Sequence, residues 1–319
     1  MNNKEYRPTL AQLRTFVTIA ENRHFGSAAA KLNISQPSLS QALVALESGL
    51  EIQLIERSTR KVIVTPSGEE LLPYAKATLE AADAFVHRAR GAQGMLTGSL
   101  AIGIIPTIAP YILPELLRII HERFPALNPK IVEETTPTLL DQLRDGRLDV
   151  ALIAFPSNVA GLSEIPLYTE NFAVAVKDDH PLAGKHDLEL SVLDDLDLLL
   201  LDDGHCLRDQ IMDLCRLAKI SLTEVTESVT RASSLTTIIQ LVAAGFGSTL
   251  LPVSAVSAEC SRPGVTVAEF DTAVAAERNV GLVYRSSSTR AAEFTALGAA
   301  ITKAYENTVA EGEPLGLTV

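Results

Sequence analysis

The sequence predicts an α/β protein built from a small helical head and a larger body in which strands and helices alternate. Three observations support this prediction. The chain has 319 residues, which suits two or three domains. Apolar residues recur at helical spacing in the first 90 residues, whereas strand-like and helix-like segments alternate in the remainder. Residues 1–90 carry 11 Lys/Arg and 9 Asp/Glu, while residues 91–319 carry the other 16 and 30.

The composition excludes several classes of protein. With 47% hydrophobic and 21% charged residues the chain is folded rather than disordered, and three Cys are too few for a disulfide-stapled secreted scaffold. No secretory signal is visible in the first residues. The uncharged stretch from Ala232 to Ala258 contains Gln, Gly and Pro, which suit a buried helix and strand better than a membrane span. We therefore expect a cytoplasmic protein with no membrane segment.

The uneven charge points to a nucleic-acid partner. The head has a net charge of +2 and the body −14, although the whole chain has −12. A basic module attached to an acidic body is a pattern of proteins that bind nucleic acid through one part. Because a head with so small a charge binds DNA weakly alone, we expect it to work as a dimer or a higher oligomer.

The head begins with two short helices. An apolar stripe from Leu10 to Ala20 predicts the first. For the second, Ser27 is the expected N-cap of an Ala-rich helix from Ala28 to Leu32, whose small side chains let another helix pack closely. Asn33 and Ile34 then form a tight turn.

The third helix has a polar outward face. Ser35 is its predicted N-cap, Pro37 lies in its first turn, and the inward stripe is Leu39, Leu43 and Leu46. Gln can bond an adenine edge twice, and Ser can contact bases or phosphates, so such a face suits the major groove of DNA. An ordinary solvated helix face is the alternative. The outward residues are Gln36, Ser38, Ser40 and Gln41.

A basic hairpin and a long helix follow. The turn from Arg57 to Lys61 leads into the alternating strand Val62–Val64 and then Thr65-Pro66-Ser67-Gly68, which together predict a β-wing able to hold phosphates. From Glu69 to Arg90 apolar residues recur at helical spacing, and a helix with such a seam is suited to dimerisation.

The stretches AENRHFGSAAAKLNISQPSLSQALVALE and LIERSTRKVIVTPSGEELLPYA resemble the DNA-binding head of LysR-type transcriptional regulators. Two positions depart from that family's pattern: Glu51 stands where Gly is common, and Ile55 where Phe is common. The resemblance implies a winged helix-turn-helix domain over residues 1–66, a linker and dimerisation helix over 67–94, and a homotetramer (a dimer of dimers) that binds double-stranded promoter DNA and contacts RNA polymerase. The residues expected to contact DNA are Ser35, Gln36, Pro37, Ser38, Ser40, Gln41, Arg57, Arg60, Thr65 and Ser67.

The body is predicted to form two α/β lobes. The first series is a β–α–β–α–β order, which implies a parallel sheet flanked by helices. Its elements are the strand Ser99–Ile105, the helix Tyr111–Phe124, the strand Lys130–Glu134, the helix Leu139–Gly146 and the strand Val150–Ile153.

A second series begins near Asn171, and its last elements return to the first lobe. With crossovers near Pro166–Glu170 and Asp271–Ala276, the plan resembles periplasmic binding proteins, whose ligands lie in the cleft at strand carboxyl ends and helix N-termini. The regulatory domain is then 95–319, with lobe I at 95–168 plus 274–306 and lobe II at 169–273. The elements of the second series are the strands Phe172–Val176, Leu198–Leu201, Thr223–Val229, Ser248–Leu251 and Asn279–Tyr284 and the helices Leu207–Ala218, Leu235–Ala244 and Thr289–Glu306.

Cys206 and Cys215 are nine residues apart in GHCLRDQIMDLC. In an unbroken helix their Cα atoms would lie roughly 13–14 Å apart along the axis and on opposite faces. A disulfide needs Cα atoms within roughly 4.4–6.8 Å. Bonding between the two thiols would therefore require the intervening segment to unwind. Two unrelated buried cysteines are the alternative interpretation.

Cys206 is the expected site of first reaction. It follows a helix-entry signal, with His205 beside it and Arg208 two residues on, and a helix N-terminus or a cation lowers the pKa of a thiol. Cys215 lies among apolar residues, which suits a buried, less reactive thiol. We therefore expect peroxide to convert Cys206 to a sulfenic acid, on which Cys215 condenses.

The runs GHCLRDQ, VAAGFGSTLLP and VGLVYR resemble the regulatory domain of the hydrogen-peroxide-sensing branch of the LysR-type family. The resemblance implies that Cys206 and Cys215 are the peroxidatic and resolving pair. It also implies a peroxide pocket in which Thr hydroxyls donate and accept hydrogen bonds and Arg278 stabilises negative charge, with Arg285 as the alternative cation. The expected pocket residues are Thr107, Thr136, His205, Cys206, Arg208 and Arg278.

The sequence thus predicts a transcriptional regulator switched by hydrogen peroxide, with a LysR-type regulator of a non-redox organic effector as the alternative. A thiol peroxidase is disfavoured because an enzyme gains nothing from the Gln/Ser face and the basic wing. Cys260 is interpreted as incidental. We expect no metal and no cofactor, because CxxC, P-loop and GxSxG motifs and metal-ligand His spacing are all absent from the sequence.

Overall fold

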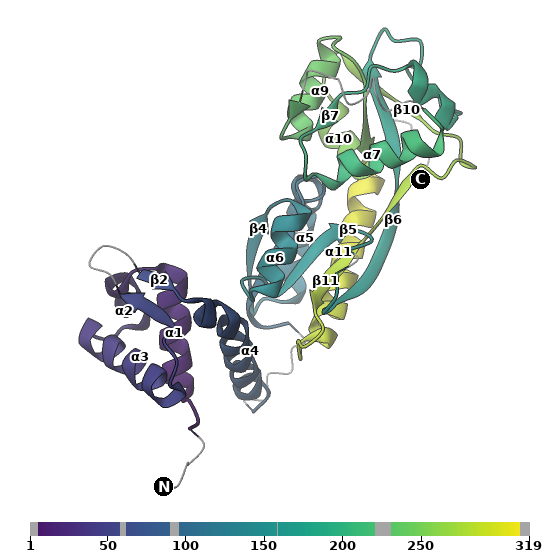
Figure 1. Cartoon of the computed structure of the whole chain (residues 1–319). Helices are drawn as coiled ribbons and strands as arrows, with labels where there is room; N and C mark the ends of the chain where they lie inside the picture. The colour runs from purple at the N-terminus through teal and green to yellow at the C-terminus, as the bar shows by residue number, and fades with distance from the viewer. Residues whose placement is uncertain (1–5, 58–61, 90–95, 158, 221–230, 313–319) are drawn as a thin grey trace. The chain divides into compact units, whose positions relative to one another are not determined.

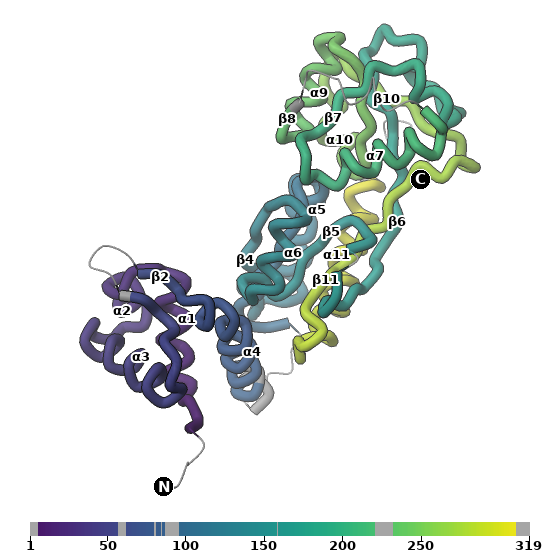
Figure 2. Tube along the Cα trace, in the orientation of Figure 1, coloured from purple at the N-terminus to yellow at the C-terminus, as the bar shows by residue number. Residues whose placement is uncertain are grey.

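The computed structural model describes residues 6–57, 62–89, 96–157, 159–220 and 231–312 (Figures 1 and 2). The chain divides into two compact units. One comprises Met1–Gln93 with Arg144–Gly146, and the other comprises Gly94–Leu143 with Arg147–Val319. Each unit has its own hydrophobic core, so each is described by itself.

The N-terminal unit is a helix-turn-helix domain with a wing, as predicted. Three helices, α1 (Leu10–Asn22), α2 (Phe25–Leu32) and α3 (Gln36–Leu50), enclose a core. The antiparallel hairpin of β1 (Ile55–Arg57) and β2 (Val62–Val64) forms the wing, and α4 (Pro66–Ala89) follows. The core residues with 1% exposure or less include Phe16, Ile19, Leu39, Leu43 and Leu46, which are the inward positions of the helical stripes.

Two helix ends in this unit differ from the expected ones. The N-cap of α2 is His24, whose Nδ1 accepts a hydrogen bond from the backbone N–H of Ser27 over 3.1 Å, so the prediction of Ser27 as the cap was wrong. The long helix starts at Pro66, three residues before the expected Glu69. At the end of α3, Glu51 adopts the left-handed conformation with φ of 56°, which Gly usually supplies.

The second unit is built on a mixed sheet, in which the predicted parallel series is confirmed and β11 runs antiparallel to its neighbours. Its strands lie in the order β10-β6-β11-β5-β3-β4, and β9 also pairs with β6. Only the β–α–β–α–β series is parallel within it: β3 (Gly98–Ile104), α5 (Ala109–Arg123), β4 (Leu127–Glu133), α6 (Thr136–Arg144) and β5 (Val150–Ala154). The strand β11 (Glu277–Arg285) runs antiparallel to β5 and to β6.

One long strand connects the two lobes of this unit. The first part of β6 (Leu162–Lys177) pairs with β11, and from Phe172 onward the same strand pairs with β9 (Thr249–Pro252) and β10 (Val265–Glu269). The predicted strand Phe172–Val176 is therefore only the carboxyl-terminal end of a 16-residue strand. Figure 2 shows β6 passing from one lobe into the other.

Each lobe has its own core. The first is packed around β3, β5, β11, α5 and α11 (Ala291–Gly312), and the second around the end of β6, β9 and three helices. Those helices are α7 (Cys206–Leu217), α9 (Leu235–Ala243) and α10 (Val253–Cys260), accompanied by the short elements η1 (Leu190–Asp195), β7 (Leu200–Leu201) and β8 (Arg231–Ala232). The predicted strand Thr223–Val229 lies outside the described residues. Within the described residues, no helix combines the length and apolar character needed to span a bilayer.

Candidate functional site

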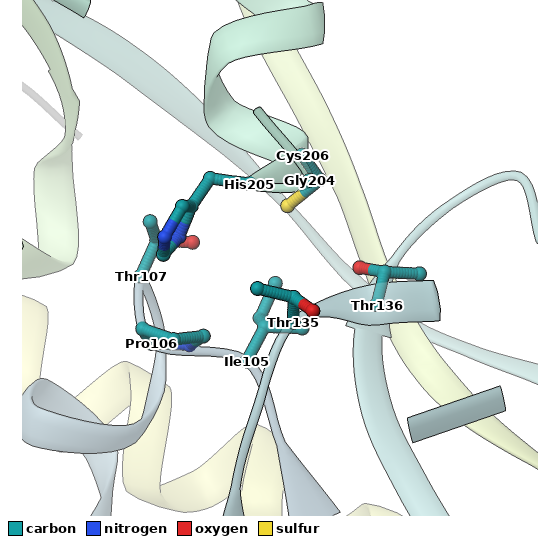
Figure 3. A pocket seen from close by; sticks show the side chains of 8 residues that line it. All are labelled: Ile105, Pro106, Thr107, Thr135, Thr136, Gly204, His205 and Cys206. Atoms are coloured by element: carbon teal, nitrogen blue, oxygen red, sulfur yellow. The ribbon is translucent and has the colours of Figure 1, made fainter. Parts of the chain in front are cut away.

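A narrow pocket lies in the second unit where the carboxyl ends of two parallel strands meet two helix N-termini (Figure 3). The segment after β3, the start of α6 and the start of α7 supply its walls. The space between its atoms is about 150 Å³. Strand ends and helix starts of an α/β sheet are the usual position for a ligand, as expected from the sequence. The lining residues are Ile105, Pro106, Thr107, Thr135, Thr136, Gly204, His205 and Cys206.

The start of α7 places the thiol of Cys206 in this pocket. Gly204 has a φ of 92°, which turns the chain into the helix, and His205 occupies the N-cap position. Cys206 is the first helical residue and is half-buried, with its sulfur directed toward the pocket in Figure 3. The pocket therefore combines a thiol with the positive end of a helix dipole.

Hydroxyl and imidazole groups surround the sulfur. Thr107 and Thr136 line the pocket with the Cys206 thiol, and both lower its pKa. Within the described residues, Thr136 Oγ1 and His205 Nδ1 are buried without a hydrogen-bond partner. Since buried polar atoms in proteins are normally satisfied, these two are positioned to bind a small polar molecule. The pocket thus brings together Thr107, Thr136, His205 and Cys206 of the predicted set.

Arg278 lies behind Thr107 rather than in the pocket lining. Its fully buried guanidinium donates to Thr107 Oγ1 over 2.9 Å and to the Thr107 carbonyl oxygen over 3.0 Å. It also donates from Nε to Glu170 Oε1 over 2.8 Å. The alternative cation, Arg285, instead donates to the carbonyl oxygens of Leu143 and Leu148. Of the two arginines, Arg278 is therefore the one beside the pocket.

Arg208 does not join these groups. Its Nε lies 3.0 Å from a carboxylate oxygen of Asp203, and its NH1 donates to the carbonyl oxygen of Leu201 over 3.4 Å. Closeness in sequence to Cys206 does not bring it into the lining, because its side chain points back toward the strand that precedes the helix. The structure places Arg208 in a contact that supports the entry into α7.

The Cys206 thiol is held protonated more firmly than an ordinary one. Burial raises its pKa, and this effect outweighs the lowering by Arg278, Thr107 and Thr136; Asp209 raises it further. The expectation of a lowered pKa from the helix N-terminus was therefore wrong. Burial, with the nearby carboxylate of Asp194, also raises the pKa of Cys215. Loss of solvation disfavours the charged thiolate at both positions.

The two cysteines occupy opposite ends of one continuous helix, as predicted. Both are free thiols, and α7 runs unbroken past each of them. Nine residues of helix at about 1.5 Å each separate their Cα atoms by roughly 13–14 Å. Cys206 packs against the core of the first lobe, whereas the fully buried Cys215 belongs to the core of the second. Forming a disulfide requires this helix to unwind.

Cys260 lies at the end of α10, far along the chain from the pocket segments. It is buried, and burial together with Glu259 raises its pKa to about 12. A thiol so strongly protonated is a poor nucleophile at neutral pH. Among the residues that the structure describes, no group of His, Cys, Asp and Glu has the arrangement of a metal site.

In the head, the predicted DNA-contacting residues differ in exposure and in the contacts that they make. Gln36, Pro37, Ser38 and Gln41 are exposed on α3, while Ser40 and Ser67 are half-buried. Ser35 caps α3 by accepting from the backbone N–H of Ser38 over 3.2 Å.

The Thr65 side chain is buried in the head, and its hydroxyl is hydrogen-bonded there. It is 8% exposed, donates to the Gln53 carbonyl oxygen over 2.7 Å and accepts from the Gly68 N–H over 3.0 Å, so its hydroxyl holds the wing onto α4. The side chain of Arg57 and the whole of Arg60 lie outside the described residues.

A helix-turn-helix head and a two-lobed α/β domain with a small pocket are typical of a transcription regulator with a ligand-binding domain. Residues 10–69 match the family model of bacterial regulatory helix-turn-helix proteins of the lysR family, and residues 93–306 match the LysR substrate binding domain. The chain belongs to the lysR family.

Similar proteins and solved structures indicate which members of the lysR family this chain resembles. A probable hydrogen peroxide-inducible genes activator from Mycobacterium avium is 49% identical over 91% of this chain and 92% of its own length. A cysteine-to-serine mutant of OxyR from Corynebacterium glutamicum with H₂O₂ bound is 62% identical, with a TM-score of 0.72 over 99% of this chain and 98% of that chain. The oxidized form of that OxyR is 61% identical, with a TM-score of 0.63 over the same shares.

The raised pKa of Cys206 predicts how its alkylation depends on pH. Because the thiolate is the form that reacts, the rate with iodoacetamide should keep rising above about pH 8.5, where an ordinary thiol is half-ionised. Peptide mass spectrometry at each pH measures this rate for Cys206 in the reduced native chain. The control is the same peptide in the urea-unfolded chain. A native midpoint below that of the unfolded chain would contradict the account.

Proposed function

We propose that this chain is a DNA-binding transcriptional regulator that senses hydrogen peroxide through Cys206 and stores the signal as a Cys206–Cys215 disulfide. The observation that carries the proposal is the pocket at the start of α7, where a thiol meets unpartnered buried hydroxyl and imidazole groups. Its relatives named for hydrogen peroxide, and the OxyR structures with H₂O₂ bound and in the oxidized form, support it.

The chemistry balances with peroxide as the only oxidant. The sulfur of Cys206 attacks one peroxide oxygen, an S–O bond forms as the O–O bond breaks, and the other oxygen leaves as water. The sulfur of Cys215 then displaces the hydroxyl group from the sulfenic acid of Cys206, so that an S–S bond forms and a second water leaves. Two thiols lose two electrons in total, and one peroxide is reduced.

The pocket residues have separate tasks in the first step. Thr107 and Thr136 orient the peroxide by donating and accepting hydrogen bonds, because a hydroxyl does both. His205 Nδ1 exchanges a proton with the reacting atoms, and Arg278 stabilises the negative charge that develops as the O–O bond breaks. This arrangement lets a thiol with a raised pKa react fast with peroxide and slowly with other oxidants.

The second step changes the protein. Since α7 must unwind to join its two ends, Cys206 leaves the first-lobe core or Cys215 leaves the second. We propose that this change alters how regulatory domains pack in a homotetramer, a dimer of dimers, and so alters the spacing of the DNA-binding heads and their contact with RNA polymerase on promoter DNA in the cytoplasm.

The pocket and the head disfavour the two other functions, a regulator with an organic effector and a thiol peroxidase. The pocket has room for no more than a very small molecule, whereas pockets that bind organic molecules of drug size enclose roughly 300–1,000 Å³, which argues against a non-redox organic effector at this site. A thiol peroxidase needs repeated turnover with a reductant, whereas a regulator needs one oxidation per signal. The helix-turn-helix head favours the regulator.

Thr136→Val tests the role of the pocket hydroxyl. Removing one group that hydrogen-bonds the reacting atoms should slow oxidation of Cys206 about 100-fold, without changing DNA binding by the reduced protein. Stopped-flow peroxide titration followed by thiol alkylation measures the rate. Thr135→Val is the matched control, since Thr135 also lines the pocket but its hydroxyl bonds Thr138 Oγ1 over 3.1 Å. Equal rates in the two variants would refute this role.

Cysteine variants test the whole proposal. In the native chain, peroxide should remove two of the three free thiols and change the gel-shift pattern on promoter DNA. Cys206→Ser should bind DNA but lose the response, and Cys215→Ser should form a sulfenic acid that dimedone labels, without a stable disulfide. Cys260→Ser should behave like the native chain. An undiminished response to peroxide in Cys206→Ser would exclude the thiol switch.

A further inference from the structure

Glu170 is a buried carboxylate on β6 that takes no part in the peroxide reaction as described above. Its side chain is fully buried, and it lies directly opposite Arg278 in the pairing of β6 with β11. One oxygen accepts from Arg278, and the other accepts from the Ser254 hydroxyl over 2.8 Å. Two residues later, at Phe172, β6 changes its partner from β11 to β9. Glu170 therefore lies at the point where the two lobes join.

A chain of buried contacts runs from Glu170 to the thiol. Arg278 donates to both Glu170 and Thr107, and Thr107 lines the pocket beside the Cys206 thiol, whose pKa it lowers. Because Thr107 Oγ1 accepts from Arg278, its single hydroxyl proton stays available to the neighbouring sulfur. The position of that proton depends on where Glu170 holds the guanidinium.

The charge balance of the buried pair also indicates that Glu170 influences the Cys206 thiol. A fully buried guanidinium is stable only when it is paired, and Glu170 supplies the paired carboxylate. If this partner were neutral, the positive charge of Arg278 would act unbalanced on its surroundings, including the thiol. Among the described residues, the ionisable groups beside the thiol or interacting with Arg278 are His205 and Asp209 at the start of α7, Glu170 and Tyr168 on β6, Tyr111 on α5 and Tyr305 on α11.

We propose that Glu170 is a positioning residue for the reaction of Cys206: it holds Arg278 against Thr107 and balances its charge, and so sets how much peroxide is needed to oxidise the thiol. The proposal rests on the peroxide-sensing function proposed above. It assigns to the junction of the lobes the control of sensitivity, while the pocket itself determines which oxidant reacts.

Glu170→Gln tests the proposal, because the amide keeps the shape and an oxygen acceptor but removes the charge. The midpoint of Cys206 alkylation against pH should fall by about one unit. At pH 7 this increases the thiolate about tenfold, and since a less basic thiolate is a weaker nucleophile, peroxide oxidation should be about threefold faster. An unchanged midpoint would overturn the proposal.

Ser254→Ala is the matched control. It removes a hydrogen bond to the same carboxylate but changes no charge, so the pH midpoint and the peroxide rate should stay as in the native chain. If Ser254→Ala shifts the midpoint as far as Glu170→Gln does, Glu170 has only a structural role. The alkylation profile needs no peroxide, so it tests Glu170 even if the native chain proves unresponsive to peroxide.

A double variant covers the case in which Glu170→Gln alone does not fold. Removing both charges of a buried pair is tolerated far better than removing one. Glu170→Gln with Arg278→Gln should therefore fold, show a midpoint no lower than the native one, and react with peroxide at least about tenfold more slowly because Thr107 is no longer oriented. A double variant with a lowered midpoint, or with the native rate, would overturn action through Arg278.

Discussion

Nine residues of continuous helix separate Cys206 from Cys215, and this spacing determines what the regulatory domain can do in each redox state. As long as α7 is intact, the thiols lie at opposite ends of it and pack into different cores, the first in one lobe and the second in the other. The bridged state is incompatible with this helix, since a disulfide brings two Cα atoms within roughly 4.4–6.8 Å. Formation of the proposed Cys206–Cys215 bond would therefore change the backbone structure by covalent geometry alone.

The pocket, in turn, determines which oxidants can reach and oxidise Cys206 in the proposed mechanism. Burial raises the pKa of Cys206, so the resting thiol is protonated and reacts poorly with general oxidants. In the proposed mechanism, Thr107, Thr136 and the cation behind Thr107 also act on a molecule small enough to reach the sulfur. The buried ion pair of Arg278 and Glu170 connects the pocket to β6, the strand that joins the two lobes. Reactivity and conformational change are thereby controlled by contacts within one region of the fold.

The features that sequence analysis predicted well are those encoded locally. Helical periodicity gave the head and α7, and the spacing of the two cysteines along α7 followed from it. Errors arose where tertiary contacts decide. A helix N-terminus beside Cys206 suggested a lowered pKa, but burial by distant segments reverses the direction. The first half of β6 was missed because Pro166 and alternating polar residues obscure a strand that only its neighbours stabilise. Glu170 gave no signal at all, since its partner Arg278 lies 108 residues away.

Hydrogen–deuterium exchange at the amides of residues 210–214, the first of which can bond the carbonyl of Cys206, tests the central claim most directly. In the reduced chain these amides belong to a helix whose inward face is buried, and they should exchange slowly. After oxidation with one equivalent of peroxide, with the Cys206–Cys215 bond verified by mass spectrometry, the same amides should lose protection while those of β3 and α5 keep theirs. Full retention of protection in the bridged form would contradict the account, because the helix would then have survived a bond that it cannot span.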